Sequence, residues 1–253
     1  GLTEVHIDDI GNVIGFRPGR GHGPVLAIGA HMDTVFPAGT DVTVRQEGNR
    51  YFAPGIGDNC SGLRALLQII RSLNEADIQT EGDIYFVATV GEEGLGDIRG
   101  SKHFVATHTI DGFIAIDNTE IGRILKGAVG SHRYRVTIEG PGGHSYGNFA
   151  EVGSAIHAMC IAGNMIAHLK TPKEPKTTFT IGTITGGTSV NSIAPSCSVE
   201  IDMRSLDNDA LLKIEAEILA CFDKAVAEEN AIWNITDPAK QVHWKKENIG
   251  NRP

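Results

Sequence analysis

The chain has 253 residues, of which 41% are hydrophobic and 21% charged, as in a globular protein large enough for one big domain or two smaller ones. Its formal net charge of −9 argues against a protein that holds phosphate backbones, so we expect no nucleic-acid partner. No apolar stretch approaches the roughly 20 residues that cross a bilayer, and no signal peptide is evident, so we expect no membrane association. Four scattered cysteines favour reduced thiols in a cytoplasmic protein.

The first half of the chain alternates strand-like and helical patterns. VLAIGA (25–30), DIYFVATV (83–90) and GFIAI (112–116) are apolar runs typical of buried strands, and residues 61–76 carry leucine and isoleucine at helical spacing. Strands that alternate with helices indicate a sheet flanked by helices. We therefore predict an α/β domain over residues 1–126.

The pattern changes after about Lys126. An alternating, half-exposed strand is followed by a helix, two strands, a second helix and one further strand, predicted at residues 132–140, 151–169, 177–186, 196–205, 207–230 and near 231–236. This order predicts a compact α+β unit of the ferredoxin-like type. We place this second domain at residues 127–235, and we expect residues 236–253 to return to the first domain.

Acidic and imidazole side chains follow the predicted strands of the first domain, at His31, Asp33, Asp58, Glu92, Glu93 and Asp117. The carboxyl ends of parallel strands share one edge of a sheet, where these carboxylates would repel one another unless a cation lay among them. Histidine nitrogen and carboxylate oxygen suit zinc, although cobalt or manganese could occupy similar ligands. Because His31 and Asp33 are two residues apart, Asp33 can hold the imidazole while its other nitrogen binds the metal.

Each of these signals also has an ordinary structural explanation. A single His-x-Asp occurs by chance, paired glutamates such as Glu92 and Glu93 are usually solvated, and aspartate followed by asparagine beside glycine is usual in turns. Their shared placement at strand ends is what favours a metal site.

Several segments resemble, in this order, motifs of the zinc-dependent aminoacylase and carboxypeptidase G superfamily: HMDTV (31–35), GIGDNCSG (55–62), GEEGLGD (91–97), Asp117, GPGGHS (140–145) and GGTSVNSIAP (186–195). That superfamily also contains succinyl-diaminopimelate desuccinylase, acetylornithine deacetylase and peptidase T-like peptidases. The resemblance implies a zinc-exopeptidase-like catalytic domain with an inserted ferredoxin-like lid that forms a homodimer. It also implies hydrolysis of an amide bond in a small peptide or an N-acyl amino acid.

The resemblance further implies two zinc ions in each complete subunit. Asp58 would bridge them, His31 and Asp117 would complete the ligands of one zinc, and Glu93 would serve the other. Glu92 would be the general base, which takes a proton from the zinc-activated water and later returns it to the leaving nitrogen.

Four more residues receive roles by the same resemblance. Asp33 would support the catalytic centre from behind its ligands, and His144 would reach it from a partner subunit to stabilise the oxyanion. Asn191 would contact the substrate, and Arg204 would bind a terminal carboxylate. Without the resemblance, His144 would be read as a surface turn histidine, and both Asn191 and Arg204 could be structural.

Members of this superfamily have a further histidine ligand beyond the lid, and nothing after residue 235 matches it, since His243 lies in a basic stretch. We therefore expect this chain to be an incomplete version of a longer protein, with a weakly held second zinc. The missing histidine favours the alternative of a non-catalytic dimerising or binding member, whereas the Glu92 and Glu93 pair opposes it. A nucleotide-binding protein is disfavoured because no phosphate loop follows the first strand.

Overall fold

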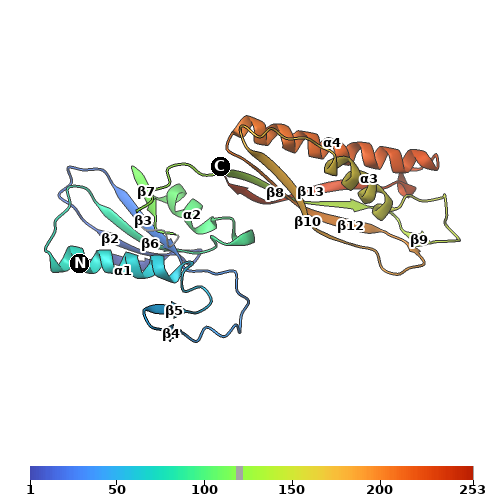
Figure 1. Cartoon of the computed structure of the whole chain (residues 1–253). Coiled ribbons are helices and arrows are strands. Elements are labelled where there is room, and N and C mark those ends of the chain that lie inside the picture. Colours follow the sequence, from blue (N-terminus) through green and yellow to red (C-terminus); the bar gives the residue numbers. More distant parts are fainter. Residues whose placement is uncertain (118–121, 253) are drawn as a thin grey trace. The chain divides into compact units, whose positions relative to one another are not determined.

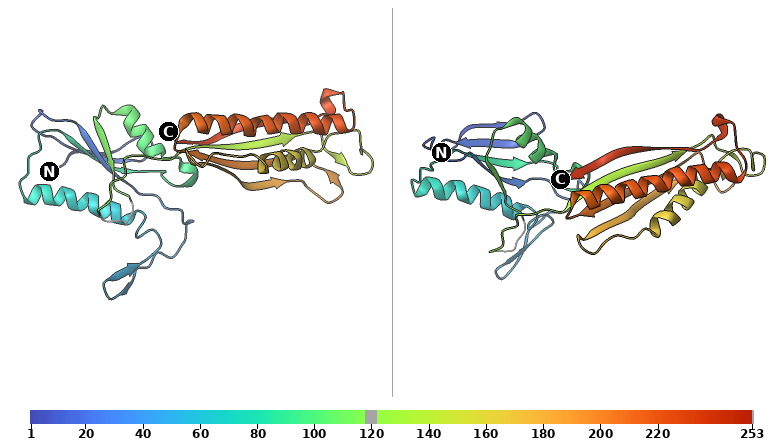
Figure 2. Two further views of the ribbon diagram at one scale, coloured as in Figure 1. Left: turned by 45° about the horizontal axis from the view of Figure 1, so that its top comes forward. Right: turned by 90° about the horizontal axis from the view of Figure 1, so that it is seen from above.

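The structure is a computed structural model that describes residues 1–117 and 122–252. The chain forms two compact units, Gly1–Ile124 and Leu125–Pro253 (Figures 1 and 2). Each unit has its own sheet, its own helices and its own hydrophobic core. Among the described residues, no helix combines the length and the apolar character that crossing a bilayer requires.

A five-stranded sheet in the order β1-β2-β6-β3-β7 runs through the first unit. β3 is parallel to β6 and to β7, whereas β2 is antiparallel to both of its neighbours, β1 and β6. The carboxyl ends of β3, β6 and β7 therefore meet at one edge. The strands of this unit, including a separate small hairpin of β4 and β5, are β1 (Thr3–Ile7), β2 (Val13–Arg17), β3 (Leu26–His31), β4 (Arg45–Glu47), β5 (Arg50–Phe52), β6 (Ile84–Thr89) and β7 (Gly112–Ala115).

Helices cover both faces of this sheet, as Figure 2 shows, and they confirm the predicted α/β layers. α1 (Cys60–Glu75) packs on the face that carries Phe86 of β6, and α2 (Arg99–Thr107) packs Phe104 against Val87 on the other face. Neighbouring residues of a strand point to opposite faces, so Phe86 and Val87 are both buried. Burial on both faces explains why the sequence of β6 is almost continuously apolar.

The second unit is an antiparallel sheet in the order β10-β12-β8-β13, with two helices packed against one face in a single core. This order and the βαββαβ connectivity are the predicted ferredoxin-like arrangement. A short ladder of β9 and β11 extends from one end of the unit. The elements are β8 (Gly130–Glu139), β9 (Gly143–His144), α3 (Ala155–Ala167), β10 (Thr177–Gly186), β11 (Ser192–Ile193), β12 (Ser196–Ser205), α4 (Asn208–Ile232) and β13 (His243–Arg252).

The last strand contradicts two expectations. The prediction of a strand near residues 231–236 is wrong, because α4 continues through Ile232 and the next strand begins at His243. β13 pairs with β8 along its length, so residues 243–252 belong to the sheet of the second unit and do not return to the first.

The charges of β13 are the physical reason for this difference. Lys245 points away from the core and forms an ion pair with Glu139 of β8, with 2.7 Å between Nζ and Oε1. Its neighbour Trp244 faces the core, where its ring lies 5.7 Å from that of Phe222. Adjacent residues of the basic stretch therefore face opposite sides of the sheet, and its lysines lie near acidic groups, Lys245 at Glu139 of β8 and Lys246 at Glu215 of α4.

Glu215 links α4 to the sheet of the second unit. Its Oε2 lies 2.6 Å from Nδ1 of His132, and its Oε1 accepts a 2.8 Å hydrogen bond from the Tyr134 hydroxyl. Lys246 Nζ lies 3.6 Å from the same carboxylate. Burial raises the pKa of Glu215, but the hydrogen bonds from Tyr134 and His132 and the nearby positive charges outweigh it, so the pKa is lowered.

We expect Glu215→Gln to lower the free energy of unfolding at neutral pH by about 1 to 2 kcal/mol, because a charged hydrogen-bond acceptor is lost. Since the folded-state pKa lies below the unfolded one, this stabilisation is present above the unfolded pKa and is lost as pH falls through the folded pKa. The difference between wild type and variant should therefore narrow below the ordinary value of 4.5. Urea titrations across pH measure it, with Glu228→Gln, exposed on the same helix, as control. A difference that is independent of pH would contradict the prediction.

Candidate metal centre

The site begins at His31, the last residue of β3, whose side chain is only 3% exposed. Its Nδ1 lies 3.0 Å from the backbone carbonyl oxygen of Asp33, which can only accept. In the neutral ring, Nδ1 therefore carries the proton and Nε2 presents a lone pair. Nε2 is buried, has no hydrogen-bond partner among the described residues, and faces Oδ1 of Asp58 at 3.0 Å. Two acceptors that face each other fit a cation between them.

Two further carboxylates surround this nitrogen. Asp117 Oδ1 lies 3.9 Å from His31 Nε2, and one ligand atom each of His31, Asp58 and Glu93 lie within 4.8 Å of one another. Burial and the charges of Asp58 and Glu92 raise the pKa of Glu93, so its ionised form lacks sufficient compensation. The structure thus brings together all four predicted metal ligands, and their donor set fits a divalent cation such as zinc.

Asp33 connects the segment that follows His31 to the segment that carries Glu92 and Glu93. Its carboxylate accepts hydrogen bonds from the backbone N–H groups of Glu92 (3.0 Å) and Glu93 (2.9 Å). We expected this carboxylate to hold the imidazole of His31, but Oδ1 lies 3.7 Å from Nδ1 and the backbone carbonyl takes that role. Burial raises the pKa of Asp33, but these hydrogen bonds outweigh it and the pKa is lowered. The charged side chain therefore fixes the backbone that carries both glutamates.

Asn59 ties the loop of Asp58 to the end of β7. Its Oδ1 accepts from the N–H of Gly62 at 3.0 Å and caps α1, and its Nδ2 donates to the carbonyl oxygen of Ile116 at 2.9 Å. Because Ile116 directly precedes Asp117, this buried amide holds two ligand-bearing segments together. Asn59 was not among the predicted site residues, because aspartate followed by asparagine beside glycine is usual in turns. An asparagine just before a helical pattern was the signal for its capping role.

The predicted lid residues lie at opposite ends of the second unit. The backbone N–H of Ser145 donates to the carbonyl oxygen of Asn191 (3.0 Å), so His144 and Asn191 share the end formed by β9 and β11. Arg204 lies at the other end of the ten-residue β12, which begins beside this ladder at Ser196. At about 3.4 Å per residue, β12 separates the two ends by about 30 Å.

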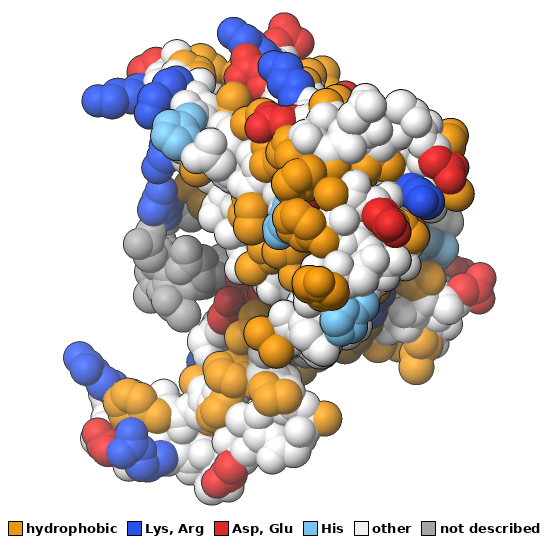
Figure 3. Space-filling view, turned by 90° about the vertical axis from the view of Figure 1, so that its right-hand side faces the viewer, with side chains coloured by type: hydrophobic (Ala, Val, Ile, Leu, Met, Phe, Trp, Pro, Cys, Tyr) orange, Lys and Arg blue, Asp and Glu red, His pale blue; other side chains and the backbone are white. Residues whose placement is uncertain are grey.

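The turn after His144 determines which nitrogen of its imidazole carries the proton. Nδ1 accepts from the backbone N–H groups of Tyr146 (3.2 Å) and Gly147 (3.3 Å), which in the neutral ring leaves the proton on Nε2. The exposed ring therefore presents an N–H donor, the group that stabilises an oxyanion. Figure 3 looks onto this end of the second unit and shows hydrophobic side chains at its surface. Phe149 and Val190, which lie close in sequence to His144 and Asn191, are exposed.

Arg204 already has a partner in its own strand. Its Nε lies 2.7 Å from Oδ2 of Asp202, whose Oδ1 lies 2.8 Å from Nε of Arg133. The side chain of Arg204 remains 47% exposed, so part of the guanidinium faces solvent.

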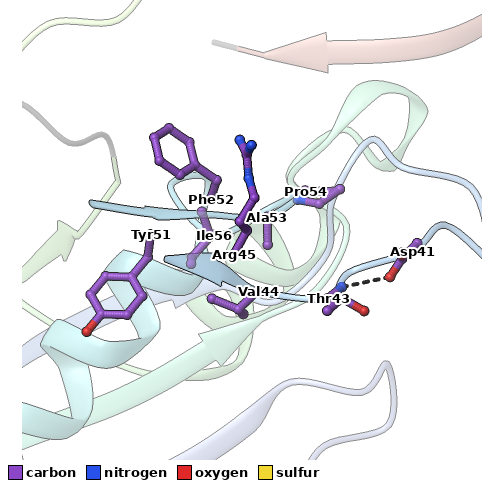
Figure 4. Close-up of a pocket in the computed structure, with 9 residues that line it drawn as sticks. All are labelled: Asp41, Thr43, Val44, Arg45, Tyr51, Phe52, Ala53, Pro54 and Ile56. Carbon is purple, nitrogen blue, oxygen red and sulfur yellow. Dashed lines mark hydrogen bonds between the residues drawn. The ribbon is translucent and has the colours of Figure 1, made fainter. Parts of the chain in front are cut away.

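Apolar cavities border the loop that carries Asp58. The larger, of about 760 Å³, lies at the β4–β5 hairpin. Figure 4 shows the side chains of Tyr51 and Phe52 in its lining, pointing away from each other. The second, of about 610 Å³, shares Tyr51 and Ile56 and reaches Gly57, which directly precedes Asp58. None of the four predicted metal ligands lines either cavity. The candidate metal centre is therefore defined by the geometry of its ligands and not by either of these cavities.

Two family models of known proteins together match most of the chain. A family model described as peptidase family M28 matches residues 12–135, and one described as a peptidase dimerisation domain matches residues 126–230. Acetylornithine deacetylase of Buchnera aphidicola is 26% identical over 216 residues, which cover 79% of this chain and 55% of that protein. Carboxypeptidase G2 of Pseudomonas sp. is 27% identical over 206 residues, with coverage of 78% and 48%.

Solved structures show the same relationship. A tripeptidase of Staphylococcus aureus has a TM-score of 0.74 and 25% identity, covering 98% of this chain and 66% of its own. The aminopeptidase PepT of Bacillus cereus has a TM-score of 0.70 and 25% identity, with coverage of 97% and 66%. The chain spans about half the length of the curated relatives it matches. The fold, the motifs and these matches support the superfamily of zinc-dependent aminoacylases, carboxypeptidases of the G type and peptidase T-like metallohydrolases as the family of this chain.

Proposed function

We propose that the complete protein is a metal-dependent hydrolase of amide bonds that acts on a small peptide or an N-acyl amino acid. The observation that carries this proposal is the buried Nε2 of His31, which faces Asp58 and Asp117 and has no hydrogen-bond partner among the described residues. The relatives named as a deacetylase, a carboxypeptidase and a tripeptidase support it, because those names all describe cleavage of an amide bond.

The metal would be held by His31, Asp58, Asp117 and Glu93, with Asp58 between two ions. The mixture of imidazole nitrogen and carboxylate oxygen suits zinc, and cobalt or manganese accept the same ligands. When bound, the metal would lower the pKa of a water molecule and polarise the carbonyl of the substrate.

Glu92 is the proposed general base. The backbone of Glu93 is extended, with φ −75° and ψ 142°, and consecutive side chains of an extended chain point apart. Glu93 can therefore face the metal while Glu92 faces the attacking water, with both N–H groups held by Asp33. The carboxylate of Glu92 takes the proton of the water and delivers it to the nitrogen that leaves.

We propose that the second unit forms a homodimer and completes the site of its partner. His144 and Arg204 lie about 30 Å apart along β12, whereas a tripeptide spans only about 10 Å. Both residues can reach one substrate only if they come from two chains. Arg204 would bind the terminal carboxylate, while His144 and Asn191 of the partner subunit would stabilise the oxyanion and contact the substrate.

A zinc titration of the full-length protein tests this function. The protein is stripped with a chelator, and zinc is added back while hydrolysis of dipeptides, tripeptides and N-acyl amino acids is followed. We expect no hydrolysis without metal and full recovery at about two zinc ions per chain. Hydrolysis that survives metal removal would contradict the proposal, and binding of less than one zinc per complete chain would favour a non-catalytic role.

A further inference from the structure

The loop between β6 and α2 carries both glutamates, and a side chain from elsewhere joins its two ends. The N–H of Val90 donates to Oδ1 of Asn12 at 3.0 Å, and Nδ2 of Asn12 donates to the carbonyl oxygen of Gly100 at 3.0 Å. The N–H of Gly100 donates back to the carbonyl oxygen of Val90 at 2.9 Å. These three hydrogen bonds form a closed ring that fixes the base of loop 90–100.

Asn12 is fully buried, and the ring and Asp8 together use most of the hydrogen-bonding capacity of its side chain. The residue is 0% exposed and directly precedes β2. Its Nδ2 also donates to Oδ2 of Asp8 at 2.7 Å, and Oδ1 of Asp8 accepts from the backbone N–H of Asn12 at 2.8 Å. Both amide protons and one oxygen lone pair are therefore engaged within the protein. A side chain used in this way holds its neighbours in place and does not bind a ligand.

The loop needs such support because part of its backbone is in a disfavoured conformation. Asp97 and Ile98 have φ values of 54° and 52°, in the left-handed region that glycine favours. Such residues persist where the surrounding structure determines them, and they cluster at functional sites. Asp33 holds the loop through the N–H groups of Glu92 and Glu93, whereas Asn12 holds it at its base.

We propose that Asn12 is a positioning residue of the metal centre, which sets where Glu93 meets the metal and where Glu92 meets the water. This inference rests on the proposed function. The hydrogen-bond ring transmits the position of β2 to the loop, so loss of the ring lets both carboxylates move relative to His31 and Asp58.

Asn12→Asp in the full-length protein tests this role, because the carboxylate keeps the size of the amide but cannot donate to Gly100 or Asp8. Asn230→Asp is the matched control. Nδ2 of Asn230 donates to the carbonyl oxygen of Val242 at 3.0 Å and its Oδ1 accepts from the same backbone at 2.9 Å, so it makes similar bonds in the second unit. Hydrogen exchange, zinc affinity, kcat, KM and melting temperature of the metal-free protein are measured for both variants.

We expect Asn12→Asp to weaken zinc binding and to lower kcat by about 10- to 100-fold each, with little change in KM, as for other groups that hold metal ligands in place. Amide exchange in peptides that cover residues 90–100 should accelerate by about tenfold or more, while exchange in β3 and β6 stays unchanged. Asn230→Asp should leave zinc affinity, kcat and exchange in loop 90–100 within about twofold of wild type. We expect this even if Asn230→Asp lowers the melting temperature as much as Asn12→Asp does.

A folded Asn12→Asp protein with unchanged loop exchange and unchanged zinc affinity would overturn the inference, as would equal losses in both variants. If Asn12→Asp does not fold, Asn12→Ser, which is too short to bridge Val90 and Gly100, is judged by the same measurements. Wild-type protein that binds zinc but hydrolyses none of the substrates would refute the proposed function, while exchange and zinc affinity still decide the role of Asn12. Active wild type with an unaffected Asn12→Asp variant would refute this inference alone.

Discussion

Glu92→Gln should lower kcat of the full-length protein by about 10²- to 10⁴-fold, the usual contribution of a general base. Glutamine keeps the shape of the side chain, but its amide cannot take the proton of the attacking water. KM and zinc affinity should change little, because Glu92 is not a predicted ligand and its backbone N–H still binds Asp33 at 3.0 Å. Steady-state kinetics and zinc analysis of the same preparations measure these three quantities.

Glu93→Gln is the matched control for this experiment. The substitution is the same and the residue is adjacent, but Glu93 lies in the cluster with His31 and Asp58. Its loss should weaken zinc binding as well as activity. If Glu92→Gln retains its kcat, Glu92 is not the general base. If Glu92→Gln rather than Glu93→Gln loses zinc, the roles of the two glutamates are reversed.

Most of the fold follows from burial patterns that a sequence displays. The central strands β3 and β6 are covered on both faces, so their sequences are almost continuously apolar and easily recognised. The strands β8 and β12 are covered on one face and alternate. β13 was missed because Lys245 obtains its partner Glu139 only once the strand lies in the sheet.

The ligands of the candidate centre could be predicted because each lies at the end of a recognisable element. Asn12 could not, because its amide bonds to a backbone group 78 residues away and leaves no local sign in the sequence. The place of Asn59 just before a helical pattern indicates a cap, but not its bond to a backbone group 57 residues away. The spacing of His31 and Asp33 correctly predicted that the two residues lie together. It did not show that the backbone oxygen of Asp33, rather than its carboxylate, would accept from the imidazole. The sequence therefore displays the groups that perform chemistry better than the groups that hold them.

Mixing two inactive variants should restore activity if the site is shared between subunits. Glu92→Gln lacks the base, and His144→Ala lacks the partner's donor, whose loss costs about 10²- to 10³-fold in kcat. A mixed dimer would contain one site with both groups intact. Random assembly makes about half of the dimers mixed, so the mixture should recover about a quarter of the wild-type activity. Two variants co-expressed with different tags provide the measurement, and no recovery would mean that Glu92 and His144 act within one chain.

Two further mixtures test whether Arg204 and His144, about 30 Å apart along β12, serve different chains. Arg204→Ala mixed with His144→Ala should also recover about a quarter of the activity, because Arg204 would serve its own chain and His144 the partner. Asn191→Ala mixed with His144→Ala should recover nothing, because both residues lie at the same end of one lid and every site would lack one of them. Recovery in this last mixture, or its absence with Arg204→Ala, would contradict a site divided between the two ends of the sheet.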